Sequence, residues 1–135
     1  MPGKWKLAAV LVARLIFAGV FAMAVTFKLI DIGATAGYIA SAGFPMPGVL
    51  AWLAVIFELG VVISLLTGAF FWQGALLAAA YVLFLAFAFH GPSHWTADQA
   101  EFGFFVDHFT FIAGLLFAAA YGPGNVLAVN VRTSR

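Results

Sequence analysis

The segment His90–Phe109, HGPSHWTADQAEFGFFVDHF, concentrates the residues of this chain that could do chemistry. It holds all three histidines and three of the five acids of a sequence in which only 8% of residues are charged. Imidazole and carboxylate groups bind metals, and imidazole exchanges protons near neutral pH. The segment therefore indicates one of four things: a metal site, a pocket for a quinone or another small hydrophobic substrate, a proton or substrate pathway, or polar anchors at helix ends.

The spacing of the histidines argues against a metal site. His90 and His94 are four residues apart, but Gly91-Pro92 between them interrupts a regular helical turn. The sequence also lacks an H-E-x-x-H pattern. Cysteine is absent, which excludes thiolate sites for zinc or iron–sulfur clusters. We predict no metal, and we find no haem or flavin signature.

A quinone pocket needs polar groups at the ligand's carbonyls and aromatic walls around its ring. Lys28, His90 and Asp107 all lie where their predicted spans reach the same, outer boundary of the membrane. Phenylalanines of the same segment could form the walls. We therefore predict that a quinone, if bound, contacts the residues Lys28, His90, Trp95, Asp107 and His108.

The composition places these residues in a membrane protein. Of the 135 residues, 65% are hydrophobic, and the mean hydropathy is +1.11, whereas soluble domains are about 45–50% apolar. A net charge of +1 provides no basic surface for nucleic acid. The lipid bilayer is the expected surrounding of this single domain.

Four apolar runs are long enough to cross a hydrocarbon core about 30 Å thick as helices: 7–30, 48–68, 70–90 and 104–122. We predict an all-α four-helix membrane bundle, with a short interfacial helix over 33–44 between the first and second spans; a plain loop is the alternative for this segment. The first run exceeds the length of a signal-peptide core and is predicted to be a span.

Basic residues predict the orientation of the spans. Lys4 and Lys6 precede the first span, and Arg132 and Arg135 follow the last, whereas the two longer loops between spans have no lysine or arginine of their own. We therefore expect both termini to be cytoplasmic and the protein to lie in the inner membrane.

Charged side chains inside the spans should pair, because an isolated charge in lipid costs about 2.5–3.5 kcal/mol or more. Arg14 and Glu58 fall at a similar depth, and we predict that they form an interior ion pair, either architectural or part of a proton path. On the fourth span Asp107, Thr110 and Gly114 share a narrow face that should point inward. His108 lies about 100° away, toward the rim.

The chain resembles DoxX/DoxD-type membrane proteins, which are small four-helix proteins. The similarity covers roughly residues 14–124 and is carried by RLIFAGVFAMAVTFKLI, by AGYIASAGFPMPGVLAWLAVIFELGVVISLLTG and by GLLFAAAYGPG. Arg14, Lys28 and Glu58 match the family's motif. The resemblance implies the membrane subunit of a thiosulfate:quinone oxidoreductase, or an accessory subunit of a membrane redox assembly.

Together these observations lead us to expect a membrane subunit of a quinone-linked oxidoreductase or respiratory assembly, with a redox or other membrane protein as partner. Four short helices leave much lipid-facing surface, so we also expect a homo-oligomer or larger complex. Two alternatives stay open: a structural subunit that clamps a larger membrane complex, and a small transporter.

Overall fold

The computed structural model describes residues 3–129 and is all-helical over that range. Four helices are long and apolar enough to cross a membrane: α1 (Lys4–Ile30), α3 (Pro47–Thr67), α4 (Phe71–His90) and α5 (Gln99–Tyr121). The predicted fold class is therefore confirmed, and the chain is a multi-pass membrane protein. Arg132 and Arg135, which contributed to the predicted orientation, lie outside the described residues.

Capping residues explain where two of the helices begin. α5 starts at Gln99, five residues before the predicted apolar run, because the Asp98 carboxylate accepts a hydrogen bond from the Ala100 N–H. Asp31 caps the short helix α2 (Ile32–Ser41) in the same way, by accepting from the Ala34 N–H. Short polar side chains thus extend the helices beyond what hydropathy alone predicts.

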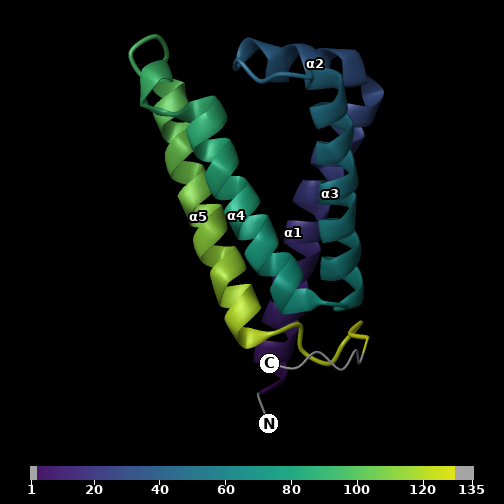
Figure 1. Cartoon of the computed structure of the whole chain (residues 1–135). Coiled ribbons are helices and arrows are strands. Elements are labelled where there is room, and N and C mark those ends of the chain that lie inside the picture. Colours follow the sequence, from purple (N-terminus) through teal and green to yellow (C-terminus); the bar gives the residue numbers. More distant parts are fainter. Residues whose placement is uncertain (1–2, 130–135) are drawn as a thin grey trace.

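α2 lies across one end of the bundle instead of along it, as an interfacial helix would (Figure 1). It ends before Gly43, whose φ of 90° breaks the helical path. Pro47 then occupies the first position of α3, where its missing N–H leaves no helical hydrogen bond unmade. A single turn of 3-10 helix, η1 (Pro92–His94), lies between α4 and α5.

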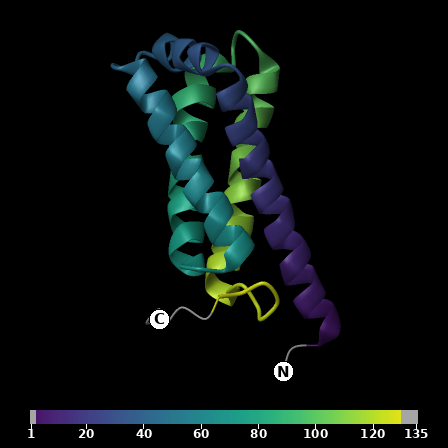
Figure 2. The same ribbon diagram turned by 90° about the vertical axis from the view of Figure 1, so that its right-hand side faces the viewer.

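The long helices form two pairs, α1 with α3 and α4 with α5, arranged as a V (Figure 1). The pairs meet near the tight turn Gly68–Phe70, which joins α3 to α4, and they diverge toward the end covered by α2. Figure 2 shows the first turns of α1 projecting past the other helices at the end opposite α2. The core is therefore confined to part of the bundle's length, and a space opens between the pairs.

The packed core lies where the two pairs converge. Phe21, Leu65 and Leu115 are buried there, from α1, α3 and α5. Alanines on α4 let the helices approach closely, because they carry almost no side chain. Across the V, the Phe17 ring packs edge-on against the Phe111 ring, with centroids 4.8 Å apart.

Arg14 links the end of α3 to the segment after α5 through backbone carbonyls, and no acidic side chain of the described residues takes part. Its five guanidinium N–H groups donate to five backbone carbonyl oxygens, at 2.6–3.1 Å, on Leu65, Leu66, Pro123, Val126 and Leu127. Leu65 and Leu66 belong to the last turn of α3, whose carbonyls have no helical partner. The other three carbonyls belong to the segment after α5. The predicted Arg14–Glu58 ion pair is therefore wrong, because backbone carbonyls take up every donor of the guanidinium.

A cavity between the helix pairs as the candidate functional site

A cavity of about 830 Å³ lies between the diverging helix pairs, beside α2. Residues from all five α-helices line it, and most of them are apolar or aromatic. Two ring pairs connect this part of the chain to α4: Tyr38 of α2 stacks on Phe89 with centroids 4.9 Å apart, and Phe44, which follows α2, lies 5.8 Å from Phe84 in a tilted arrangement. The volume lies within the usual range of small-molecule sites, about 300–1,000 Å³.

One end of the cavity, the Lys28 end, is lined by Lys28 and Tyr81, both of which bond to the buried Glu58. The Lys28 Nζ donates to Glu58 Oε1 at 2.9 Å, and the Tyr81 hydroxyl donates to Glu58 Oε2 at 3.2 Å. The Glu58 side chain is only 3% exposed, whereas that of Lys28 is 23% exposed and lines the cavity. Glu58 is thus a buried carboxylate with both oxygens bonded, and its cationic partner is Lys28, not Arg14.

The other end, the His90 end, consists of Tyr38, His90 and His108. The two imidazole rings lie 5.0 Å apart between centroids, and His90 Nδ1 is 2.5 Å from Glu101 Oε2. His108 Nδ1 is 2.6 Å from the Phe104 carbonyl oxygen. Because a carbonyl can only accept, His108 must carry a proton on Nδ1. Its other nitrogen, Nε2, is therefore the one that remains for exchange chemistry.

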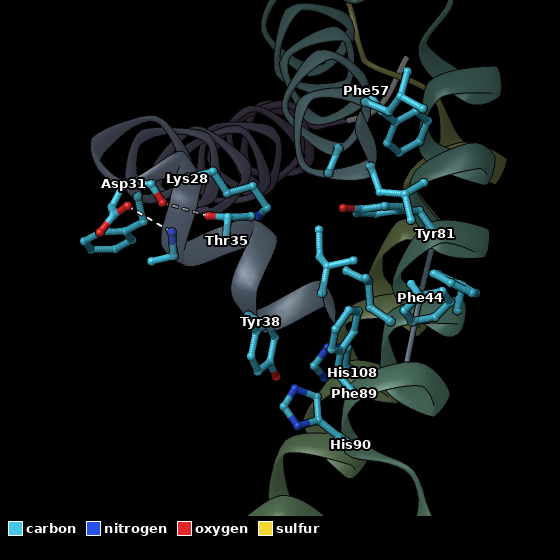
Figure 3. A pocket seen from close by; sticks show the side chains of 18 residues that line it. Lys28, Asp31, Thr35, Tyr38, Phe44, Phe57, Tyr81, Phe89, His90 and His108 are labelled. Carbon is cyan, nitrogen blue, oxygen red and sulfur yellow. Dashed lines mark hydrogen bonds between the residues drawn. The ribbon is translucent and has the colours of Figure 1, made fainter. Parts of the chain in front are cut away.

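Tyr38 is the aromatic hydroxyl of the His90 end, and it comes from α2. Burial, and then the negative charge of Glu101, raise the pKa of the Tyr38 phenol above its ordinary value of 10.0. At neutral pH the phenol is therefore protonated and can donate a hydrogen bond. Figure 3 shows Tyr38, His90 and His108 gathered at one end of the cavity, with Lys28 and Tyr81 farther along it.

The two ends are too far apart to bind opposite sides of one ring. Tyr81 and His90 are nine residues apart on α4, which corresponds to about 13.5 Å along the helix. The wall between them is formed by aromatic and aliphatic side chains. The cavity is thus an apolar chamber with a polar group at each end.

Only some of the site residues predicted from the sequence line the cavity. Lys28, His90 and His108 line the cavity, whereas Asp107 is exposed and does not. The face of α5 that faces the cavity passes through His108, about 100° around the helix from Asp107. The expected cluster of Lys28, His90 and Asp107 is therefore not formed, because Lys28 and His90 lie at opposite ends of the cavity and Asp107 lies outside it. Trp95 also lies off the cavity, donating from Nε1 to the His90 carbonyl at 2.9 Å.

Two cavity residues, Tyr38 and Tyr81, were not among the predicted site residues. Tyr81 is the only polar side chain of α4 between Gln73 and His90, and a lone hydroxyl in an apolar helix was the signal available. Tyr38 had no comparable signal, because its role depends on α2 folding back against α4.

Among the described residues, 3–129, no group of three or more histidine, aspartate or glutamate side chains is arranged to hold a metal ion. His94, in η1, is exposed and does not line the cavity with the other two histidines.

Four apolar spanning helices around a cavity with a buried lysine–glutamate pair define a helical membrane protein with an internal ligand-sized site. The family model DoxX matches residues 9–91, more than half of the chain, and the chain belongs to the DoxX family. The match includes Arg14, Lys28, Glu58 and Tyr81, and ends just after His90. No match was found among curated proteins, and none among solved structures.

Proposed function

We propose that this protein is the membrane subunit of a quinone-linked oxidoreductase and that the cavity binds the quinone. The observation that carries the proposal is an apolar, aromatic-walled cavity of about 830 Å³ with a lysine at one end, inside a membrane bundle. Membership of the DoxX family supports the broader role, since that family is often associated with oxidoreductases. A hydrophobic ring that partitions into lipid suits such a chamber.

The charge at the Lys28 end favours a neutral ligand. The positive charge of Lys28 is balanced by Glu58 at 2.9 Å, and Asp31 also lines the cavity, so this end carries no excess positive charge. A carboxylate or phosphate ligand would need an unbalanced cation in this apolar setting. A quinone is neutral, and its carbonyl oxygens need only a hydrogen-bond donor, which Lys28 can supply.

Lys28 is the residue best suited to hold that carbonyl. An ammonium has three N–H donors, and within the described residues only one of them is used, toward Glu58. The Tyr81 hydroxyl directs its proton to Glu58, so its oxygen can accept from a ligand hydroxyl. Lys28 and Tyr81 together could therefore hold either a carbonyl or a hydroxyl group.

The His90 end would exchange protons with the surroundings. Histidine and acidic side chains form proton relays in membrane proteins, and Glu101 provides a carboxylate next to His90. A bound quinone supplies two-electron, two-proton redox chemistry, and this cysteine-free chain needs a partner subunit to deliver or remove the electrons. We propose the inner membrane as the location, with both termini cytoplasmic.

The test is to purify the protein from its native membranes in mild detergent and to quantify extracted quinone per chain. Ala54→Phe fills the cavity from α3, whereas Leu83→Ala changes an exposed position on α4 and serves as the control. We expect roughly one quinone per chain in the wild type and in Leu83→Ala. In Ala54→Phe the quinone content per chain should fall at least tenfold.

Three outcomes would overturn the proposal. If Ala54→Phe keeps the quinone of the wild type, the ligand lies elsewhere. A quinone-free wild type that retains protein partners would favour an accessory clamp. A quinone-free chain that conducts protons across vesicles, and loses this conduction in Glu58→Gln, would favour transport.

A further inference from the structure

Asp107 places a carboxylate on the exposed surface of a membrane-spanning helix. It lies in α5, and the side chain forms no hydrogen bond or ion pair with another residue in the described range 3–129. Val106 and Phe109, one and two residues away along α5, are also exposed and are apolar. The carboxylate therefore emerges among side chains that face lipid.

The depth of Asp107 makes this position costly. The contact between His90 and Glu101 marks the polar end of the α4–α5 pair. Asp107 is six residues beyond Glu101 on α5, about 9 Å farther into the apolar part of the bundle. An aspartate side chain is too short to bring its charge back to the interface over that distance, and ionisable groups in lipid are paired as a rule.

The surface around Asp107 is shaped for a helix. Gly103, Asp107, Thr110 and Gly114 follow one face of α5 at helical spacing. Gly114 contacts the Phe17 ring of α1, with only 2.7 Å between that ring and a methyl group built on the glycine. Toward the α2 end α1 and α5 separate (Figure 1), and Gly103 has open space beside it. Small residues on such a face permit close approach of another helix.

We propose that this face of α5, the Asp107 face, docks a transmembrane helix of a different protein, and that this helix carries a lysine or arginine opposite Asp107. The charge of the face determines the partner's chemistry, because a carboxylate in lipid is stabilised by a cation or a strong hydrogen-bond donor.

A second copy of the chain is a poorer complement. A twofold contact centred on Asp107 would bring it against Asp107 of the other copy, and like charges repel. The described spans also hold no spare cation near this end: Arg14 is saturated by five carbonyls, and Lys28 is paired with Glu58. Lys4 and Lys6 lie at the far end of α1.

The experiment places a photo-crosslinking amino acid at Thr110, one turn from Asp107, in the full-length protein in its native membrane. The crosslinked peptide is identified by mass spectrometry. We expect a transmembrane segment of another protein with a lysine or arginine within one turn of the crosslink. Asp107→Asn should lower the yield at least tenfold. Asp107→Lys, combined with an acid in place of the partner's basic residue, should restore it.

Asp98→Asn is the matched control. It also removes one carboxylate from the start of α5, but asparagine caps a helix as well as aspartate does, so the crosslink should be unchanged. Crosslinks to a second copy of this chain, or to lipid alone, would overturn the proposal, as would an undiminished crosslink in Asp107→Asn. Quinone content should not change in Asp107→Asn, because Asp107 is off the cavity. The two proposals can thus fail separately.

Discussion

Lys28 of α1 and Glu58 of α3 form a 2.9 Å ion pair inside the bundle, and the carboxylate of that pair is almost completely buried. The pair joins the two helices of one arm of the V near the position where the cavity opens. The same two side chains therefore stabilise the fold and present a polar group to a ligand.

Removing one partner of this pair should cost more than removing both. Lys28→Met leaves the Glu58 carboxylate with only the Tyr81 hydroxyl, and loss of one partner of a buried pair costs about 3–5 kcal/mol. Lys28→Met combined with Glu58→Leu should recover most of that loss, because no charge remains buried. Unfolding by denaturing detergent in mixed micelles measures the stability of the single and the double variant. Equal stability of the single and double variants would contradict this account.

Arg14 should not be replaceable by lysine. An ammonium offers three donors where the guanidinium uses five, so at least two carbonyls lose their bonds, at about 1–3 kcal/mol each where they are buried. The segment after α5 should then detach from the end of α3. Hydrogen exchange of the Val129 N–H, which donates to the Thr67 carbonyl at 2.7 Å, should accelerate in Arg14→Lys. Unchanged exchange would show that Arg14 does not hold this segment.

Gly68 should tolerate no side chain. Its φ is +77°, and a methyl group would lie 2.9 Å from the Cα of Ala128. The left-handed conformation alone costs a non-glycine residue roughly 1–2 kcal/mol, and the backbone contact adds to this. Gly68→Ala should lower the melting temperature. Gly19→Ala is the control: it is helical with open space around it, so it should be neutral or stabilising.

Alkaline pH should weaken the contact between α2 and the α4–α5 pair. The pKa of Tyr38 is raised in the folded protein, by burial first and by Glu101 second. Its contribution to stability is therefore fully present below the unfolded value of 10.0 and is lost as the pH rises through the folded pKa. Tyr38→Phe should show a smaller loss of stability above about pH 10.

Phenolate absorbance, taken as the difference between the wild type and Tyr38→Phe, follows the titration of Tyr38 itself. Glu101→Gln should shift that titration to lower pH without returning it to the ordinary value, because burial remains. A titration unaffected by Glu101→Gln would exclude the electrostatic contribution.

Hydropathy alone predicted the four spans, because a span needs a long apolar run and little else. It misjudged the start of α5, where the Asp98 cap extends the helix beyond the apolar run. The DoxX resemblance likewise depended only on the order of motifs along the chain, and the family match confirms it.

The sequence alone could not predict which charged side chains pair with one another. Depth along separate spans made Arg14 and Glu58 suitable partners, but depth does not report the rotation of a helix or the path of the segment after α5. That segment returns beneath the bundle and supplies three carbonyls to Arg14, which leaves Glu58 to Lys28.

The sequence by itself determined that this is an all-α membrane protein of the DoxX family and which few polar residues enter its spans, because composition and periodicity are local properties. Only the tertiary structure decided which of them meet. Divergence of the helix pairs opened the cavity, α2 brought Tyr38 to His90, and a rotation of about 100° on α5 turned His108 toward the cavity and Asp107 away from it. Such contacts depend on how helices pack, and no single segment encodes them.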